Sequence, residues 1–142
     1  YVRIILKKSM YNKDGEKATD LSLDALDLHL LNSDDWIVDE TVTTKDRMGM
    51  YYKKILLVGE TTTSLTDYIR IDDSILWKAE EKNITEKNGY ATIMMDYTYD
   101  GISFAIDIEA DAVQTHNAED AIRSAWGRDV TIDSNGNIES FN

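Results

Sequence analysis

Apolar and polar residues alternate over a long stretch late in the chain, from Ile102 to Ala112. One parity carries the apolar residues Ile102, Phe104, Ile106, Ile108, Ala110 and Ala112. The other parity carries Ser103, Asp107, Glu109 and Asp111, with Ala105 among them. Because successive side chains of a strand point to opposite faces, this period of two predicts a long strand with one buried and one solvated face.

The period changes after His116, where helical spacing begins. One apolar stripe at this spacing is formed by Ala118, Ala121, Ile122, Ala125 and Trp126. Asn117 is a good N-cap residue, and Gly127 is a natural helix end. We therefore predict a helix from Ala118 to Trp126 that covers an opening in the core, with Trp126 as the plug.

Shorter patterns predict the remaining elements. The opening run alternates Val2, Ile4 and Leu6 with Arg3 and Lys7. Further β-prone runs lie at 26–31, 36–38, 50–57, 67–71, 89–99, 130–132 and 138–141, and a short turn or helical piece is expected at 22–25. The turn signal Tyr99-Asp100-Gly101 predicts a hairpin that joins the run 89–99 to the long strand. Residues 40–47 predict a polar loop, and residues 74–83 carry helix formers but stay ambiguous.

Many short strands with turns about every ten residues are typical of a mainly β protein. We expect an antiparallel β-sandwich with one or two short helices, including Ala118–Trp126. No Pro- or Ser-rich linker and no repeat divides the chain. We therefore expect one domain over residues 1–142. The chain begins at Tyr1 inside a strand-like run, which suggests a processed or trimmed sequence.

Composition narrows the possible functions. The 142 residues include no cysteine, so neither a disulfide framework nor a thiolate zinc site is available. No run of about 18 apolar residues exists that would span a membrane. A formal net charge of −12 argues against binding nucleic acid, whose phosphates would be repelled. The same charge is compatible with a solvated surface, weak calcium binding or a basic partner.

Several stretches occur in the order found in one family of exported proteins. They are YVRIILKK from Tyr1, NSDDWIV around Trp36, MYYKKILLVGETTTSL with Tyr51, Tyr52, Lys53, Leu56, Gly59, Glu60, Thr62 and Leu65, and FAIDIEADAVQTHNAEDAIRSAWG with Ala110, Ala112, Val113, Gln114, Ala125 and Trp126. In this order and spacing the chain resembles the TasA/camelysin-like exported proteins of Gram-positive bacteria. The resemblance covers most of the chain, although no single stretch is very specific.

The resemblance implies a jelly-roll-like sandwich, export through a dedicated signal peptidase of the SipW type, and a place at the cell surface or in the biofilm matrix. It also implies a role as a fibre subunit or related surface protein. Family members usually carry one or two strands before the YVR strand. We therefore expect such upstream strands and a signal peptide to be missing from this sequence.

Catalytic chemistry finds little support in the residue pattern. Some members of this family have been classed as metalloproteases, and a zincin needs two histidines one helical turn apart with a glutamate between them. Here His29 and His116 are far apart in sequence and no HExxH motif occurs. No GxSxG motif and no phosphate-cradling glycine loop occurs either. We expect no catalytic residues, no cofactor and no metal site, and hence a protein that is not an enzyme.

Three sets of polar residues have both an ordinary structural explanation and a functional one. Asp133 to Asn137 resembles an oxygen-rich calcium loop, but a hairpin turn explains it better because no glutamate closes a twelve-residue loop. The carboxylates of Asp107, Glu109 and Asp111 form an acidic stripe, for which we expect Lys or Arg on the neighbouring strand. Asn83-Ile84-Thr85 matches a glycosylation sequon, which we take as chance. The tyrosines Tyr51, Tyr52, Tyr90, Tyr97 and Tyr99 are explained as β-formers.

Our leading hypothesis is a non-enzymatic, exported structural protein of the cell surface or biofilm matrix that assembles by strand addition. The acceptor would be an exposed sheet edge near Tyr1, and the partner would be another copy or another surface protein. The alternative is a surface-attached binding module for a polymer or protein, with residues 40–47 and 74–88 as the contact surface. Two carboxylates facing each other in a deep cleft would instead favour an enzyme.

Overall fold

The computed structural model describes residues 1–73, 79–87, 90–97 and 99–142, with the side chains of residues 79–87 and 90–97 outside the described part. The protein is mainly β, with antiparallel sheets, as the sequence predicted. The elements are β1 (Val2–Tyr11), the 3-10 helix η1 (Leu23–Ala25), β2 (Leu26–Leu30), β3 (Trp36–Asp39), β4 (Arg47–Tyr52), β5 (Thr66–Ile71), β6 (Ala79–Lys87), β7 (Tyr90–Tyr97), β8 (Ser103–Ala112), α1 (Ala118–Trp126), β9 (Val130–Ile132) and β10 (Ile138–Phe141).

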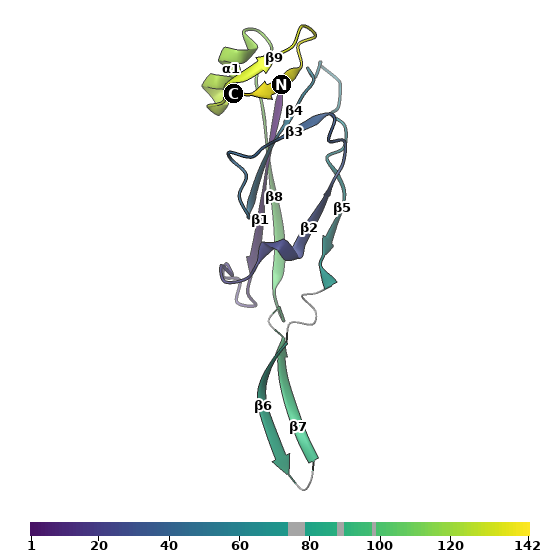
Figure 1. Ribbon diagram of the computed structural model, residues 1–142, viewed down its shortest axis with the longest axis vertical. Coiled ribbons are helices and arrows are strands. Elements are labelled where there is room, and N and C mark those ends of the chain that lie inside the picture. Colours follow the sequence, from purple (N-terminus) through teal and green to yellow (C-terminus); the bar gives the residue numbers. More distant parts are fainter. Residues whose placement is uncertain (74–78, 88–89, 98) are drawn as a thin grey trace.

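The largest sheet has the strand order β3-β4-β1-β8. β1 is an interior strand, paired with β4 on one side and with β8 on the other. The expectation that the strand of Tyr1 forms a sheet edge is therefore wrong. The alternation of apolar and basic residues in β1 resembles that of an edge strand, but strands from two distant parts of the chain pair with both of its sides. The edges of this sheet are β3 and β8 (Figure 1).

The two-stranded sheet β2-β5 forms a second layer on one face of the large sheet, which we call the inner face. On that face Leu6, Trp36, Met50 and Tyr52 form a buried cluster against which the β2 residues Leu28 and Leu30 pack. Lys8 of β1 also donates from Nζ to the Leu26 carbonyl at 2.7 Å. Two layers are therefore present. The β-sandwich and its jelly-roll-like arrangement stay predictions, since the described strands form one four-stranded and three two-stranded sheets.

The C-terminal segment of α1, β9 and β10 covers part of the opposite face, which we call the outer face, and gathers at one end of the molecule (Figure 1). Tyr51 of β4 packs there against Trp126 and Phe141, with ring centroids 5.3 and 4.6 Å apart. The helix has the predicted bounds, but its plug is Ile122, which is 0% exposed, rather than the half-buried Trp126. We call this segment the C-terminal cap.

Three local predictions need correction. Asn117 occupies the N-cap position with a left-handed backbone (φ 49°) and makes no side-chain cap hydrogen bond. β7 pairs with β6, whereas β8 pairs with β1, so the predicted hairpin between residues 89–99 and the long strand is wrong. Residues 79–83 begin a strand, while residues 74–78 of the same ambiguous run lie outside the described residues. Figure 1 shows β6 and β7 extending beyond the two layers.

The β4 prediction was shifted along the chain. The run 50–57 was expected to be a strand, but the observed strand begins at Arg47 and ends at Tyr52. Residues 53–65 connect it to β5 and contain a turn in which Glu60 N–H donates to the Leu57 carbonyl at 3.0 Å. Gly59 has φ +88° in this turn, a conformation that favours glycine and ends the extended run.

Candidate interaction edge

β8 is a ten-residue strand that pairs with β1 alone within the described ranges 1–73, 79–87, 90–97 and 99–142. The register is continuous from Val2 opposite Ala112 to Tyr11 opposite Ser103. At its end the Val113 N–H donates to the Tyr1 carbonyl at 3.0 Å, and the Tyr1 nitrogen donates to the Val113 carbonyl at 2.9 Å. These two residues are thus a hydrogen-bonded pair of an antiparallel ladder.

Hydrogen-bonded and non-hydrogen-bonded pairs alternate along such a ladder. The odd-numbered residues of β8 therefore bond to β1, while its even-numbered residues direct their N–H and C=O groups to the free edge. The other side of β1 agrees with this alternation, because the Lys8 N–H donates to the Asp46 carbonyl at 2.7 Å, on the β4 side. The residues with edge-facing backbone groups are Phe104, Ile106, Ile108, Ala110 and Ala112.

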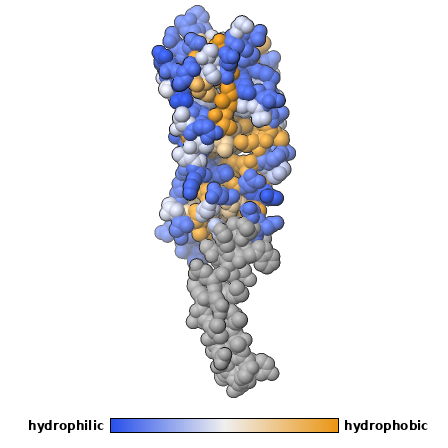
Figure 2. Space-filling model, viewed as in Figure 1, coloured by the Kyte–Doolittle hydropathy of each residue, from blue (hydrophilic) through white to orange (hydrophobic). Residues whose placement is uncertain are grey.

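The inner face beside this edge is only partly covered. Ile108 lies opposite Leu6, which is 3% exposed, yet Ile108 itself is 66% exposed. On the second layer Ile69 lies opposite Leu28 and is 54% exposed. Both isoleucines share a face with buried or packed neighbours and still contact solvent. Figure 2 shows exposed apolar surface along the middle of the body between hydrophilic regions.

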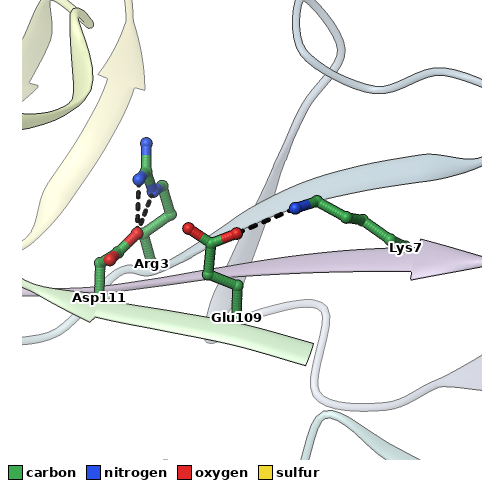
Figure 3. A network of polar contacts seen from close by, with 4 residues as sticks. All are labelled: Arg3, Lys7, Glu109 and Asp111. Atoms are coloured by element: carbon green, nitrogen blue, oxygen red, sulfur yellow. Dashed lines mark hydrogen bonds and ion pairs between the residues drawn. The ribbon is translucent and has the colours of Figure 1, made fainter. Parts of the chain in front are cut away.

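The outer face of β8 carries the acidic stripe, and basic residues of β1 lie opposite it. The Arg3 guanidinium contacts Asp111 Oδ2 at 2.5 Å, and Lys7 Nζ contacts Glu109 Oε2 at 3.1 Å (Figure 3). The expectation of Lys or Arg opposite these carboxylates is confirmed. Asp107 forms no ion pair within the described part of the chain. The edge therefore combines an apolar inner side with an acidic outer side.

The opposite sheet edge, β3, has a polar contact that sequence reasoning missed. Asp39 at the end of β3 is 2% exposed and accepts from Thr41 N–H at 3.0 Å and from Thr41 Oγ1 at 2.6 Å. Its other oxygen lies 2.9 Å from Arg128 Nε, an ion pair that links β3 to the C-terminal cap. No motif in the sequence indicates this pair, since Asp39 and Arg128 become neighbours only through the fold.

The two histidines lie in separate surroundings. His29 of β2 contacts Asp67 through Nδ1 at 2.7 Å and stacks on Tyr68 with ring centroids 4.7 Å apart. The contact with His29 lowers the pKa of the Asp67 carboxyl. His116 lies exposed between β8 and α1. No group of three or more potential metal ligands occurs among the residues that the structure describes.

The Asp133 loop is a hairpin turn between β9 and β10, as predicted. Asp133 Oδ1 accepts from the backbone N–H groups of Asn135 and Asn137, both at 2.8 Å. The backbone hydrogen bond from Asn137 lowers the pKa of this carboxyl most strongly. The carboxylate is thus occupied by the turn itself.

The structure says less about partner binding at 40–47 and 74–88, the two loops predicted as a contact surface. Within 40–47 the hydroxyls of Thr41 and Thr43 donate to oxygens of Asp39, and Arg47 belongs to β4. Val42 lies so close to Gly49 that a Cβ added to Gly49 would be 2.5 Å from Cγ2 of Val42. In 74–88, residues 74–78 and 88 lie outside the described residues. The sequon 83–85 falls in β6, whose side chains also lie outside the described part.

The predicted tyrosines have different locations. Tyr51 and Tyr52 are buried in β4 at 1% and 6% exposure. Burial raises the pKa of the Tyr51 hydroxyl, and the nearby charge of Asp39 adds to this effect. Tyr90 and Tyr97 are the end residues of β7, whose side chains fall outside the described part. The described tyrosines of β4 thus serve the core.

No protein-family model matches this chain, and no curated protein or solved structure matches it. Among the residues that the structure describes, no helix has the length and apolar character needed to cross a membrane. The molecule is thus defined by its fold class, a mainly β protein with antiparallel sheets, and by the free edge of β8.

Proposed function

We propose that this protein is a non-enzymatic structural protein of the cell surface or biofilm matrix that assembles by adding a strand to the free edge of β8. The observation that carries the proposal is the row of edge-facing backbone groups from Phe104 to Ala112 next to the exposed Ile108. An added strand gains main-chain hydrogen bonds from such a row and register from its alternating side chains.

The form of the edge supports an acceptor role. Proteins usually protect edge strands by making them short, by bulges or proline, or by covering them. β8 has ten residues, contains no proline and keeps an unbroken register with β1. Among the described residues, the protection of β8 consists of the charges on its outer face. An exposed edge of this length favours pairing with another chain.

The location and the structural role rest on the resemblance to the TasA/camelysin-like exported proteins, carried by Tyr1-Val2-Arg3, Tyr51-Tyr52-Lys53 and Ala125-Trp126. The fold is compatible with that resemblance through its antiparallel layers. Export and assembly are both consequences of the proposal that experiments can address separately.

The test uses Ala110→Pro, because Ala110 directs its N–H to the free edge and proline there leaves the β1–β8 ladder intact. We expect oligomers or filaments of the unchanged protein, alone or mixed with the other surface proteins of its source, by light scattering and negative-stain microscopy, and their loss in Ala110→Pro. Ser134→Pro is the matched control, since Ser134 is exposed and occupies the second position of the Asp133–Gly136 turn, which accepts proline.

If Ala110→Pro assembles as well as Ser134→Pro does, the β8 edge is not the acceptor. If the unchanged protein stays monomeric both alone and mixed with other surface proteins of its source, the proposal of assembly by strand addition is wrong. A circular-dichroism spectrum equal to that of the unchanged protein ensures that the loss reflects the edge and not unfolding.

The alternative function, a binding module for a polymer or protein, is favoured by a different loop from those predicted. Leu57 and Val58 at the tip of the β4–β5 connection are 63% and 106% exposed. Neighbouring apolar side chains at a loop tip suit a contact with a partner. Replacing both by serine would then abolish partner binding while leaving Ala110→Pro-sensitive assembly unchanged.

A further inference from the structure

We infer that the strand received by β8 belongs to another protein and alternates apolar with basic residues. This inference rests on the proposed function, that β8 accepts a strand, and adds the chemistry of the partner. It follows from the different characters of the two faces beside the edge.

The inner face selects apolar residues. Ile108 and Ala110 are exposed on this face, and Leu6 lies buried on the neighbouring strand. An added strand with apolar residues at every second position would cover Ile108 and remove apolar surface from water.

The outer face selects basic residues. Asp107, Glu109 and Asp111 project from this side at every second position. Glu109 and its partner Lys7 keep 52% and 48% of their side-chain surface exposed, so a second cation has room to approach. Opposite charges facing each other on adjacent strands stabilise the pair, whereas like charges destabilise it.

β1 shows that a strand of this pattern pairs with β8. It places Val2, Ile4 and Leu6 against the apolar positions of β8, and Arg3 and Lys7 beside the acidic ones. The free edge presents the same side chains on the same two faces. A second strand of similar chemistry therefore fits the opposite edge in antiparallel orientation.

A second copy of this chain is a poor occupant. Antiparallel pairing of two β8 strands would bring Asp107, Glu109 and Asp111 against the same residues of the copy, and each chain carries a formal charge of −12. β1, the strand with the required alternation, is held on both sides by β4 and β8 in the folded chain. A folded copy therefore cannot donate it.

The test measures binding of two labelled peptides to the folded protein by fluorescence anisotropy. The first has the sequence of residues 2–11, and the second carries Arg3→Glu and Lys7→Glu in that sequence. We expect the basic peptide to bind about tenfold more tightly, given two charge pairs changed from attraction to repulsion. This preference should shrink as salt increases, because the side chains are exposed.

Protein variants locate the peptide and exchange the preference. Ala110→Pro should abolish binding of the basic peptide, whereas Ser134→Pro should not. Asp107→Lys combined with Glu109→Lys should favour the acidic peptide instead. Circular dichroism of each variant checks that the fold is retained, and the Ser134→Pro protein serves as the common reference.

The outcomes separate this inference from the proposed function. If both peptides bind equally and Ala110→Pro abolishes both, the charge selection is wrong and strand addition stands. If neither binds but the protein forms Ala110→Pro-sensitive oligomers alone, a second copy is the occupant and this inference is overturned. If neither peptide binding nor any association depends on Ala110, both proposals fail.

Discussion

The two edges of the four-stranded sheet differ in length, cover and charge. β3 has four residues, and its last residue, Asp39, is 2% exposed and ion-paired with Arg128 of the C-terminal segment. β8 has ten residues, and its inner-face Ile108 is 66% exposed. The closed edge, β3, is short and its end is held by an ion pair to the C-terminal cap, whereas the open edge, β8, is long and pairs with β1 alone among the described residues.

The difference shows where this chain protects itself from unwanted pairing. An uncovered edge with apolar side chains favours aggregation unless it has a partner, so proteins ordinarily shorten or cover it. Here the C-terminal cap reaches β3 through Arg128, while no described element reaches the free side of β8.

The largest effect is expected at the closed edge. Asp39→Ala removes the charge beside Arg128 and the acceptor for Thr41, leaving a partly buried cation without its partner. We expect a loss of about 3 kcal/mol in the free energy of unfolding, measured by urea denaturation. Asp39→Asn keeps an acceptor oxygen and should lose less. An Asp39→Ala protein as stable as the original would show that the cap does not depend on this pair.

A second prediction compares isoleucines at the two sites. Ile122 is 0% exposed within the cap cluster, so Ile122→Ala should lower the free energy of unfolding by about 3 kcal/mol. Ile108→Ala should change it by less than about 0.5 kcal/mol, because most of that side chain already contacts water. Urea denaturation of both variants checks this. Equal losses would mean that Ile108 is covered in solution.

A third prediction separates the two sides of β8. Glu109→Pro removes an N–H that bonds to β1 and should cost about 2 kcal/mol, through the lost hydrogen bond and local distortion. Ala110→Pro removes an edge-facing N–H and should cost less than about 1 kcal/mol. Thermal denaturation compares the two proteins. A reversed order would contradict the assignment of the edge-facing groups.

The smallest effect concerns the turn of the cap. Hydrogen bonds hold the pKa of Asp133 below its usual range, so its charged form stabilises the fold above the pKa of the unfolded chain. That contribution is lost as pH falls through the lowered folded-state pKa. Between about pH 7 and about pH 3, the original protein should therefore lose more stability than Asp133→Asn, which does not titrate. Urea midpoints at both pH values measure the difference, and identical losses would contradict it.

The strength of each local pattern explains what the sequence could predict. Ile102–Ala112 repeats with a clear period of two and Ala118–Trp126 with a helical stripe, and both elements form there. The expectation of a Lys or Arg opposite the acidic stripe is also confirmed, although the sequence did not show that Arg3 and Lys7 of β1 would supply it.

Strand partners were harder to predict because they depend on distant residues. The turn at Tyr99–Gly101 suggested a local hairpin, but β8 pairs with β1 at the other end of the sequence. For the same reason the open edge was assigned to Tyr1 rather than to β8. An apolar stripe likewise does not tell which member lies deepest, so Trp126 was chosen where Ile122 is buried.

Amide hydrogen exchange followed by NMR tests the free edge most directly. In dilute protein, the amides of Ile106, Ile108 and Ala110 should exchange rapidly, while those of Asp107 and Glu109 exchange slowly through their bonds to β1. Adding the basic peptide, or the natural partner, should slow exchange at the first three. Protection of these three in the dilute protein, or unchanged fast exchange after binding, would contradict strand addition at β8.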